Sequence, residues 1–250
     1  MKKLIFLLIV AFALAACGGQ QQKADTGHAL ADNTLTEAEI EEGWILLFDG
    51  ESPGNWRGYN MDYFPSAWEV ADGMIRCHGL GNGESEGLER GDIIYDKKFS
   101  NFELSLEWKI SPGGNSGVFY LADERPDLAI WQTAPELQVI DNNAVPYDQD
   151  GLHSAGSLYD IIGVPQDKVK PVGEWNKVRV LINNGLVKHW LNGELVVEYN
   201  LWTPEWNDMV AASKFPNYNP DWADVPKEGY IGLQDHGDDV WFKNIKLREL

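Results

Sequence analysis

Two segments of the sequence carry polar side chains of the kind that transfer protons, at the alternating spacing of β-strands. In Pro135–Asp141, Glu136 and Gln138 fall on one face of a period-two pattern. Near the C-terminus, Gln234 and His236 have the same relation to each other. Carboxylates and imidazoles are common general acids and bases, and the pKa of histidine lies near neutrality. We therefore expect Glu136 and His236 to be catalytic, and Gln138 and Gln234 to bind substrate, in one groove.

A third acidic residue, Glu107, lies in a pair of strands near the middle of the chain. The segment Asn101–Tyr120 alternates polar and apolar residues, breaks at a glycine-rich loop, and resumes with Asn115. We interpret its halves as neighbouring strands, which would bring Glu107 as a catalytic group and Asn115 as a binding group into the same groove. The alternative for Glu107 and Glu136 is a structural carboxylate paired with lysine, and for His236 it is a loop histidine.

The long segment Asn142–Pro171 has little periodicity, and a loop of this length in a compact domain is usually functional. Tyr159 within this segment, and Asp141 just before it, could bind hydroxyl groups of a substrate. Lys170 could stabilise a negatively charged oxygen, although a solvated lysine is the simpler interpretation.

His189 is expected to pair with Val180 across an Asn-Gly turn, on a strand face otherwise made of aliphatic residues. A single histidine on such a face is either a core residue or a ligand-binding group. Glu136, His189 and His236 together could hold a divalent metal ion, although the sequence lacks the tight ligand spacing that typifies zinc sites.

The composition limits the range of ligands. The 250 residues carry a formal net charge of −19, so electrostatic repulsion disfavours nucleic acids and polyanionic glycans. Aromatic residues make up 12% of the chain; most can fill a core, and some can stack on sugar rings. A neutral oligosaccharide or glycoside is therefore the expected partner.

Strand and turn patterns dominate the chain after about residue 35. Strong hairpin signals occur at three turns, Asp72-Gly73, Asn184-Gly185 and Asn192-Gly193. A short helix begins at Thr36, where Glu39 completes a capping box. Many short strands with glycine- and proline-rich turns predict an all-β protein, a two-sheet antiparallel jelly-roll sandwich, in a single domain over residues 35–250.

The N-terminus has the features of a bacterial lipoprotein signal. Lys2 and Lys3 precede an apolar run that is too short to span a membrane. Leu14-Ala15-Ala16-Cys17 resembles a lipobox, which implies cleavage before Cys17 and its acylation; a plain signal peptide is the alternative. We expect a signal peptide over residues 1–16, a lipidated flexible tether over 17–34, and a protein anchored by lipid in the periplasm or outer membrane of a Gram-negative bacterium.

Six short motifs occur in the order found in a known family. They are Leu47-Phe48-Asp49-Gly50, Gly114-Asn115-Ser116-Gly117, Pro135-Glu136-Leu137-Gln138, Gly173-Glu174-Trp175-Asn176, His189-Trp190-Leu191-Asn192-Gly193 and Gly232-Leu233-Gln234-Asp235-His236-Gly237. In these motifs, which span nearly the whole mature chain, the sequence resembles the 3-keto-disaccharide hydrolase family. The resemblance implies a concanavalin A-like jelly-roll sandwich and activity on glycosides already oxidised at C3 of a glucose unit.

A substrate of that kind needs acid–base chemistry. The C3 ketone acidifies the C2 hydrogen, so a base can remove it, the C1 substituent can leave by elimination, and water can add back. Oxidation at C3 would need a separate enzyme. The sequence contains no recognisable nucleotide-binding loop, so no nucleotide cofactor is implied, whereas a divalent metal ion could assist as a Lewis acid.

Two other functions fit the same sequence. A carbohydrate-binding lipoprotein would use the same groove and aromatic residues without turnover. A two-carboxylate glycosidase would use Glu107 and Glu136 to stabilise an oxocarbenium ion, although the sequence lacks the close E-x-D-x-x-E cluster of laminarinase-like enzymes on this fold.

Overall fold

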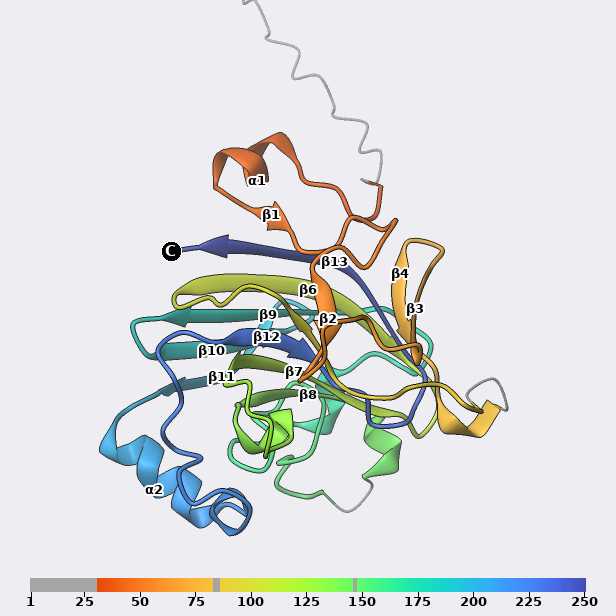
Figure 1. The fold of residues 1–250 in the computed structure, drawn as a ribbon. Coiled ribbons are helices and arrows are strands. Elements are labelled where there is room, and N and C mark those ends of the chain that lie inside the picture. The colour runs from red at the N-terminus through yellow and green to blue at the C-terminus, as the bar shows by residue number, and fades with distance from the viewer. Residues whose placement is uncertain (1–30, 83–85, 146–147) are drawn as a thin grey trace, which may run out of the picture.

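The computed structural model of the chain describes residues 31–82, 86–145 and 148–250, which form two antiparallel β-sheets packed face to face (Figure 1). The predicted signal peptide, Cys17 and most of the predicted tether lie outside these residues. Within the described ranges, no helix has the length and apolar composition needed to cross a bilayer.

The described elements are short, as the turn signals predict. The strands are β1 (Ile45–Leu46), β2 (Trp56–Gly58), β3 (Trp68–Ala71), β4 (Met74–Cys77), β5 (Ile93–Tyr95), β6 (Phe102–Ile110), β7 (Asn115–Ala122), β8 (Glu136–Ile140), β9 (Asn176–Asn183), β10 (Leu186–Leu191), β11 (Glu194–Asn200), β12 (Tyr230–Leu233) and β13 (Val240–Glu249). The helices are α1 (Glu37–Glu41) and α2 (Pro204–Ala212), with 3₁₀ turns at Leu80–Asn82, Ile130–Gln132, Asn142–Ala144, Gln166–Lys168 and Phe215–Asn217.

The strands form one eight-stranded and one five-stranded sheet. The larger sheet has the order β11-β10-β9-β6-β13-β4-β3, with β1 added beside β13, and the smaller sheet has the order β2-β5-β12-β7-β8. Their facing side chains form one continuous apolar core that runs from Leu47 to Leu247. The predicted jelly-roll sandwich of concanavalin A-like type is therefore confirmed.

Local turn and cap chemistry follows the sequence closely. The hairpins β3–β4, β9–β10 and β10–β11 form at the predicted Asx-Gly turns, and His189 pairs with Val180 as expected. Thr36 and Glu39 make the predicted capping box at the start of α1. These features are confirmed because each depends on neighbouring residues alone.

The prediction that β6 and β7 are neighbouring strands is wrong. β6 lies between β9 and β13 in the eight-stranded sheet, whereas β7 lies between β8 and β12 in the five-stranded sheet. The glycine-rich loop between them therefore crosses from one sheet to the other. Periodicity identifies both strands but does not say which sheet each strand joins.

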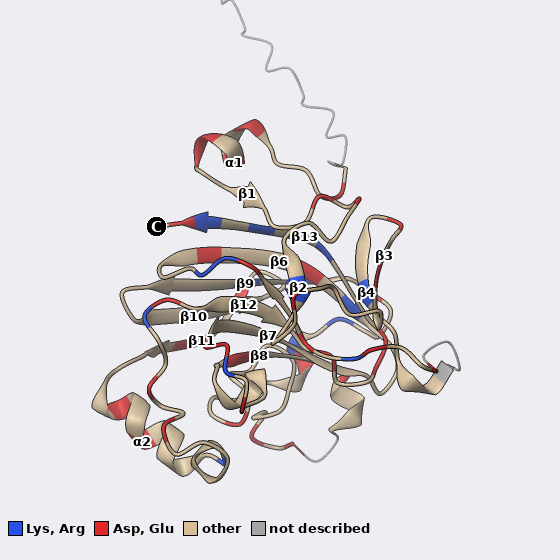
Figure 2. Ribbon diagram, viewed as in Figure 1, with Lys and Arg blue, Asp and Glu red and all other residues tan. Residues whose placement is uncertain are grey.

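The outer face of the eight-stranded sheet carries charged side chains that form ion pairs with one another. Blue Lys and Arg segments run along β13 in Figure 2, and Arg248 from this strand contacts Glu103 of β6 at 2.7 Å. Arg179 of β9 contacts the same carboxylate at 2.7 Å. Glu103, a charged residue on this outer face, is consequently only 3% exposed.

His189 is buried between the two sheets and serves as a polar core residue. Its Nδ1 donates to the Gly156 carbonyl over 3.2 Å, so its Nε2 accepts from the Tyr120 hydroxyl over 2.8 Å. The Tyr199 hydroxyl in turn lies 2.8 Å from that of Tyr120. Burial lowers the pKa of His189 to about 4, so the imidazole is neutral at physiological pH.

This burial predicts a pH-dependent stability. Unfolded His189 titrates near its ordinary pKa of 6.5 and the folded residue near 4, so between these values the unfolded chain binds more protons. The contribution of His189 therefore decreases as pH falls from 6.5 to 4, by about 3 kcal/mol of unfolding free energy. In urea unfolding, His189→Gln should show a correspondingly smaller loss over this range than the wild type. Parallel curves would contradict the assignment.

Candidate active site

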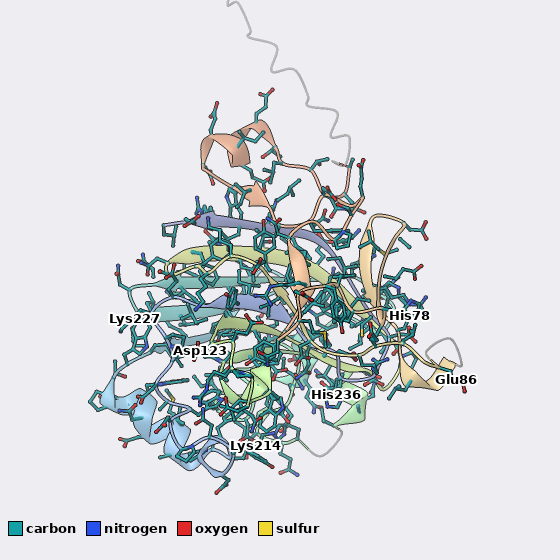
Figure 3. All side chains as sticks on the ribbon, viewed as in Figure 1. His78, Glu86, Asp123, Lys214, Lys227 and His236 are labelled. Atoms are coloured by element: carbon teal, nitrogen blue, oxygen red, sulfur yellow. The ribbon has the colours of Figure 1, made fainter. Side chains whose placement is uncertain are left out.

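A hollow of about 320 Å³ lies on the outer face of the five-stranded sheet. Six of the residues predicted from the sequence to form the site line it, namely Asn115, Glu136, Gln138, Tyr159, Gln234 and His236. Trp131, Lys214, Phe215 and Tyr218 complete the lining. Figure 3 labels Lys214 and His236, which both lie in the lower half of the molecule in this view.

The floor of the hollow is a polar row that crosses four strands. Gln138 of β8 is paired with Gly117 of β7, and the backbone N–H of Gln234 donates to the Gly117 carbonyl over 3.0 Å. Leu233 is paired with Ile93, which places Asp92 beside Gln234 at the next position of the ladder. Alternation then directs these polar side chains outward and their apolar neighbours into the core.

Gly117 creates the space in which the Glu136 side chain lies. A Cβ at this position would be only 1.9 Å from Oε1 of Glu136, so any other residue would displace the carboxylate. The Gln138 amide, oriented to satisfy its hydrogen-bonding partners, donates to the same Oε1 over 3.2 Å and to the Ser116 carbonyl over 3.0 Å. The Glu136 carboxylate is thus held across the row by its strand neighbours.

Two effects raise the pKa of Glu136 well above its ordinary value. Burial is the larger, since Glu136 is 5% exposed, and the negative charge of Asp92 adds to it. The positive charge of Lys214 acts in the opposite direction. The carboxylate form of such a group is a stronger base than an ordinary carboxylate, which suits proton abstraction.

Asp92 is a second carboxyl group with a raised pKa. Burial of its carboxyl is the main cause, although the residue keeps some solvent-accessible surface, and its pKa rises to about 7. The backbone N–H of Asp235 donates to Oδ1 of Asp92 over 2.9 Å, which favours the charged form and limits the rise. The negative charge of Asp235 adds to the rise, and the charge of Asp92 in turn raises the pKa of Glu136.

The turn after β12 presents His236 at the rim. The Asp235 side chain is only 1% exposed; it contacts Arg90 and accepts hydrogen bonds from the backbone N–H groups of Gly91 and Gly237, both at 3.1 Å. His236 is 53% exposed, and its Nδ1 lies 3.8 Å from Oδ2 of Asp238. A fixed turn with an accessible imidazole at the rim can exchange protons with both ligand and solvent.

Lys214 and Tyr159 form a cationic and aromatic wall opposite the row. Nζ of Lys214 donates to the Tyr159 hydroxyl over 2.9 Å and lies 4.2 Å from the centre of its ring. The Asp160 carboxylate connects the loop that carries Tyr159 to the segment that carries Lys214. It accepts from the backbone N–H of Lys214 over 2.9 Å and lies 3.1 Å from Nε2 of His153 in its own loop.

Aromatic residues form the rest of the wall. Tyr218 is 52% exposed, and its ring packs edge-on against Trp131 with their centres 4.9 Å apart. Phe215 stacks on buried Trp222 at 4.0 Å, which anchors the segment that carries the wall. Flat apolar surface beside hydrogen-bonding groups is the usual arrangement for binding a sugar ring or a similar neutral ligand.

Four predicted site residues lie elsewhere. Glu107 is on the outer face of the eight-stranded sheet, where it accepts from Asn244 over 3.1 Å, because β6 and β7 belong to different sheets. Lys170 donates to the Trp175 carbonyl over 2.9 Å. Asp141 caps the 3₁₀ turn that follows β8 and also accepts from the Gly113 backbone N–H over 2.8 Å. His189 is in the core, so these four expectations for the groove are wrong in their placement.

The three residues predicted as a metal set do not come together. Glu136 and His236 face the hollow, whereas His189 is buried on the other side of the sheet. Among the described residues, no three His, Cys, Asp or Glu side chains form a group that could hold a metal ion.

Sequence analysis predicted Tyr159 but missed Asp92, Lys214 and the other aromatic residues of the wall, Trp131, Phe215 and Tyr218. The tryptophan- and proline-rich stretch from about residue 200 to 227 was a signal for the wall, since such a composition is unusual for a simple connection. Asp92 gave no signal beyond its position at the start of a strand.

Comparison with known proteins agrees with the motifs. A family described as the 3-keto-alpha-glucoside-1,2-lyase-like domain matches residues 43–248. The chain belongs to this family. The resemblance seen in the six motifs is therefore confirmed.

Several members or relatives are similar over their whole length. A protein of Bacteroides thetaiotaomicron named 3-keto-disaccharide hydrolase is 39% identical over 289 aligned positions, which cover 100% of both chains. A crystal structure from Parabacteroides distasonis, described provisionally as a glycosyl hydrolase, has a TM-score of 0.78 at 33% identity and covers 88% of this chain and 100% of its own. A second such structure from that organism has a TM-score of 0.63 at 28% identity, over 83% and 99% of the two chains.

The coupling between the two buried acids can be tested by titration. Asp92→Asn removes a negative charge that raises the pKa of Glu136, so the Glu136 pKa should fall. Carbon-13 NMR of labelled carboxyl groups measures it directly, and in the wild type Asp92 should titrate near 7.

Asp208→Asn, at an exposed position of α2, is the matched control for this titration and should leave the Glu136 pKa unchanged. An unchanged Glu136 pKa in Asp92→Asn would show that the two acids do not interact.

Proposed function

We propose that this protein cleaves 3-keto-glycosides, with Glu136 as the base that removes the C2 proton. The observation that carries the proposal is the buried, pKa-raised Glu136 carboxyl group, held over Gly117 and facing a cation and a sugar-sized aromatic wall. The name and family of the relatives support the same substrate class.

The first step of the proposed reaction is proton abstraction. The Glu136 carboxylate takes the hydrogen from C2 as a proton. The electron pair of the C–H bond forms a C2–C3 double bond, and the π electrons of the ketone move onto its oxygen, which gives an enolate. Lys214 and the Tyr159 hydroxyl lie on the wall opposite the row and supply a positive charge and a hydrogen bond for that oxygen. Gln138, Gln234 and Asn115 hold the other hydroxyl groups.

The second step is departure of the C1 substituent. The enolate re-forms the ketone and pushes electrons into a C1–C2 double bond, and the C1–O bond breaks as His236 donates a proton to the leaving oxygen. Water then adds to C1 and gives a proton to His236, which restores the imidazolium, and Glu136 returns its proton to C2. The net reaction is hydrolysis of the 3-keto-glycoside, and release before water addition would make the enzyme a lyase.

The alternatives from the sequence fare differently. A two-carboxylate glycosidase built on Glu107 and Glu136 is disfavoured because these residues belong to different sheets. A carbohydrate-binding protein without turnover would use the same hollow and remains the second candidate, since an aromatic wall and amide groups suffice for binding. The raised pKa of Glu136 favours catalysis, because binding alone gains nothing from a buried acid.

Substrate and mutation together test the proposal. The wild type should release the aglycone from a 3-keto-glucoside but not from its unoxidised parent. Glu136→Gln should lower kcat/KM by about 10³-fold, because it removes the base. Glu107→Gln, a matched change in the other sheet, should leave kcat/KM within about twofold.

The outcomes separate the candidates. Substrate recovered from deuterated water should carry deuterium at C2 if proton abstraction is reversible. Binding of the keto form without release would favour the carbohydrate-binding protein, and release from the unoxidised parent would favour an ordinary glycosidase. Full activity in Glu136→Gln would remove this residue from the mechanism.

We also propose that the mature protein is anchored through lipid on Cys17, in the periplasm or outer membrane. Ala31, Asp32 and Thr34 lie against the outer face of the eight-stranded sheet, opposite the face with the hollow. A tether that joins the domain on this side would leave the hollow accessible to soluble substrate.

Labelling with palmitate in cells tests the anchor. Cys17→Ser should lose both the label and the membrane association, whereas Cys77→Ser should keep both, because Cys77 is buried in the core. Label retained in Cys17→Ser would contradict the proposal.

A further inference from the structure

A second hollow, of about 300 Å³, lies at one end of the sandwich. Residues from the ends of β6 and β8, the start of β9 and the loop before β9 line it, and none of them lines the first hollow. Two residues that the sequence assigned to the catalytic groove, Asp141 and Lys170, belong to this lining. So do Glu174 and Asn176 of the Gly173–Asn176 motif, which the proposed reaction does not use.

Within the described part of the chain, one buried hydrogen-bond donor at this hollow, the Trp108 indole N–H, has no acceptor, and the Asn176 amide beside it makes no hydrogen bond through its nitrogen. Trp108 and Asn176 are paired across β6 and β9, and each is 1% exposed. The indole N–H of Trp108 meets no partner among the described residues. Asn176 uses its amide oxygen to accept from the Lys170 backbone N–H over 2.8 Å and from Asn192 over 2.9 Å, while its Nδ2 donates to none of the described residues. Buried donors are normally paired, so the unpaired Trp108 indole beside an unused amide nitrogen indicates a missing acceptor.

The Asn176 amide is held in this orientation by its neighbours. Because its oxygen already accepts two hydrogen bonds, its nitrogen must face away from them. Asn192, which fixes it, also donates to the Lys168 carbonyl over 3.1 Å, so the arrangement is rigid. A rigid donor beside an aromatic ring is a preorganised binding group rather than a surface side chain.

The rim of this second hollow supplies a hydrogen-bond acceptor, and its charge restricts which ligands can bind. Glu174 is exposed and forms no ion pair among the described residues, so its carboxylate can accept hydrogen bonds and repels anions. The free indole and amide N–H groups repel cations. Lys170, the lysine in the lining, is engaged with the Trp175 carbonyl.

We propose that this second hollow binds a neutral polyhydroxylated ligand of monosaccharide size. Hydroxyl groups both donate and accept hydrogen bonds. They can therefore accept from the N–H groups of Trp108 and Asn176 and donate to the carboxylate of Glu174. A volume of about 300 Å³ is at the lower end for ligand pockets and suits one sugar ring. The two hollows share no lining residue, so we expect binding in the second not to require turnover in the first.

NMR of the tryptophan indole N–H groups with D-glucose as the probe tests this site. The Trp108 resonance should shift in a saturable manner with a dissociation constant in the millimolar range, up to about 100 mM glucose. Glu174→Ala should weaken this binding by about fivefold, because it removes one charge-assisted hydrogen bond. Glu205→Ala, a matched change on exposed α2, should leave it unchanged.

Two further measurements complete the test. Glu136→Gln in the first hollow should not alter the glucose-induced shift of Trp108, and Glu174→Ala should keep the wild-type rate on a 3-keto-glucoside. The proposal is overturned if glucose shifts Trp131 but not Trp108, if the Trp108 shift never saturates, or if Glu174→Ala binds as tightly as the wild type. The first of these would assign glucose to the catalytic hollow, the second would leave only water at the free donors, and the third would show that Glu174 does not contact the ligand.

Discussion

Burial of the Glu136 carboxyl group over Gly117 is the interaction on which the site depends. The side chain can lie there only because β7 has no Cβ at that point, where a methyl carbon would come within 1.9 Å of Oε1. The same position removes the carboxyl from water and raises its pKa. Strand pairing and the glycine thus create the space for the carboxyl group, and its burial in that space sets its acid strength.

The segment between β11 and β12 makes that burial effective. The rings of Tyr199, Trp206 and Trp222 stack in sequence at 5.3 and 5.7 Å, which fixes the segment to the core although it has little regular structure. From this base it delivers Lys214 and Tyr218 to the hollow. A sheet face alone would leave Glu136 open to solvent, so the wall and the acid need each other.

The limits of sequence reasoning follow from the range of each interaction. Glu136, Gln138, Gln234 and His236 were found because alternation fixes their face and neighbouring residues fix their turns. Glu107 was misplaced because sheet membership depends on contacts between distant segments, which periodicity does not record. Lys214 was missed for the same reason, since it comes from an irregular segment whose position depends on aromatic stacking in three dimensions.

In the proposed reaction the charge inside the hollow stays constant, which is why a buried site can perform it. Before proton transfer, Lys214 faces the negative charge of Glu136. The positive charge of Lys214 lowers the pKa of Glu136, whereas burial and the charge of Asp92 raise it. Afterwards Glu136 is neutral and the negative charge lies on the enolate oxygen, still beside Lys214. The cation therefore stabilises base and enolate in turn, and no new charge is created in a medium of low dielectric constant. An exposed carboxylate would be a weaker base, and without Lys214 burial and the charge of Asp92 would raise the Glu136 pKa further.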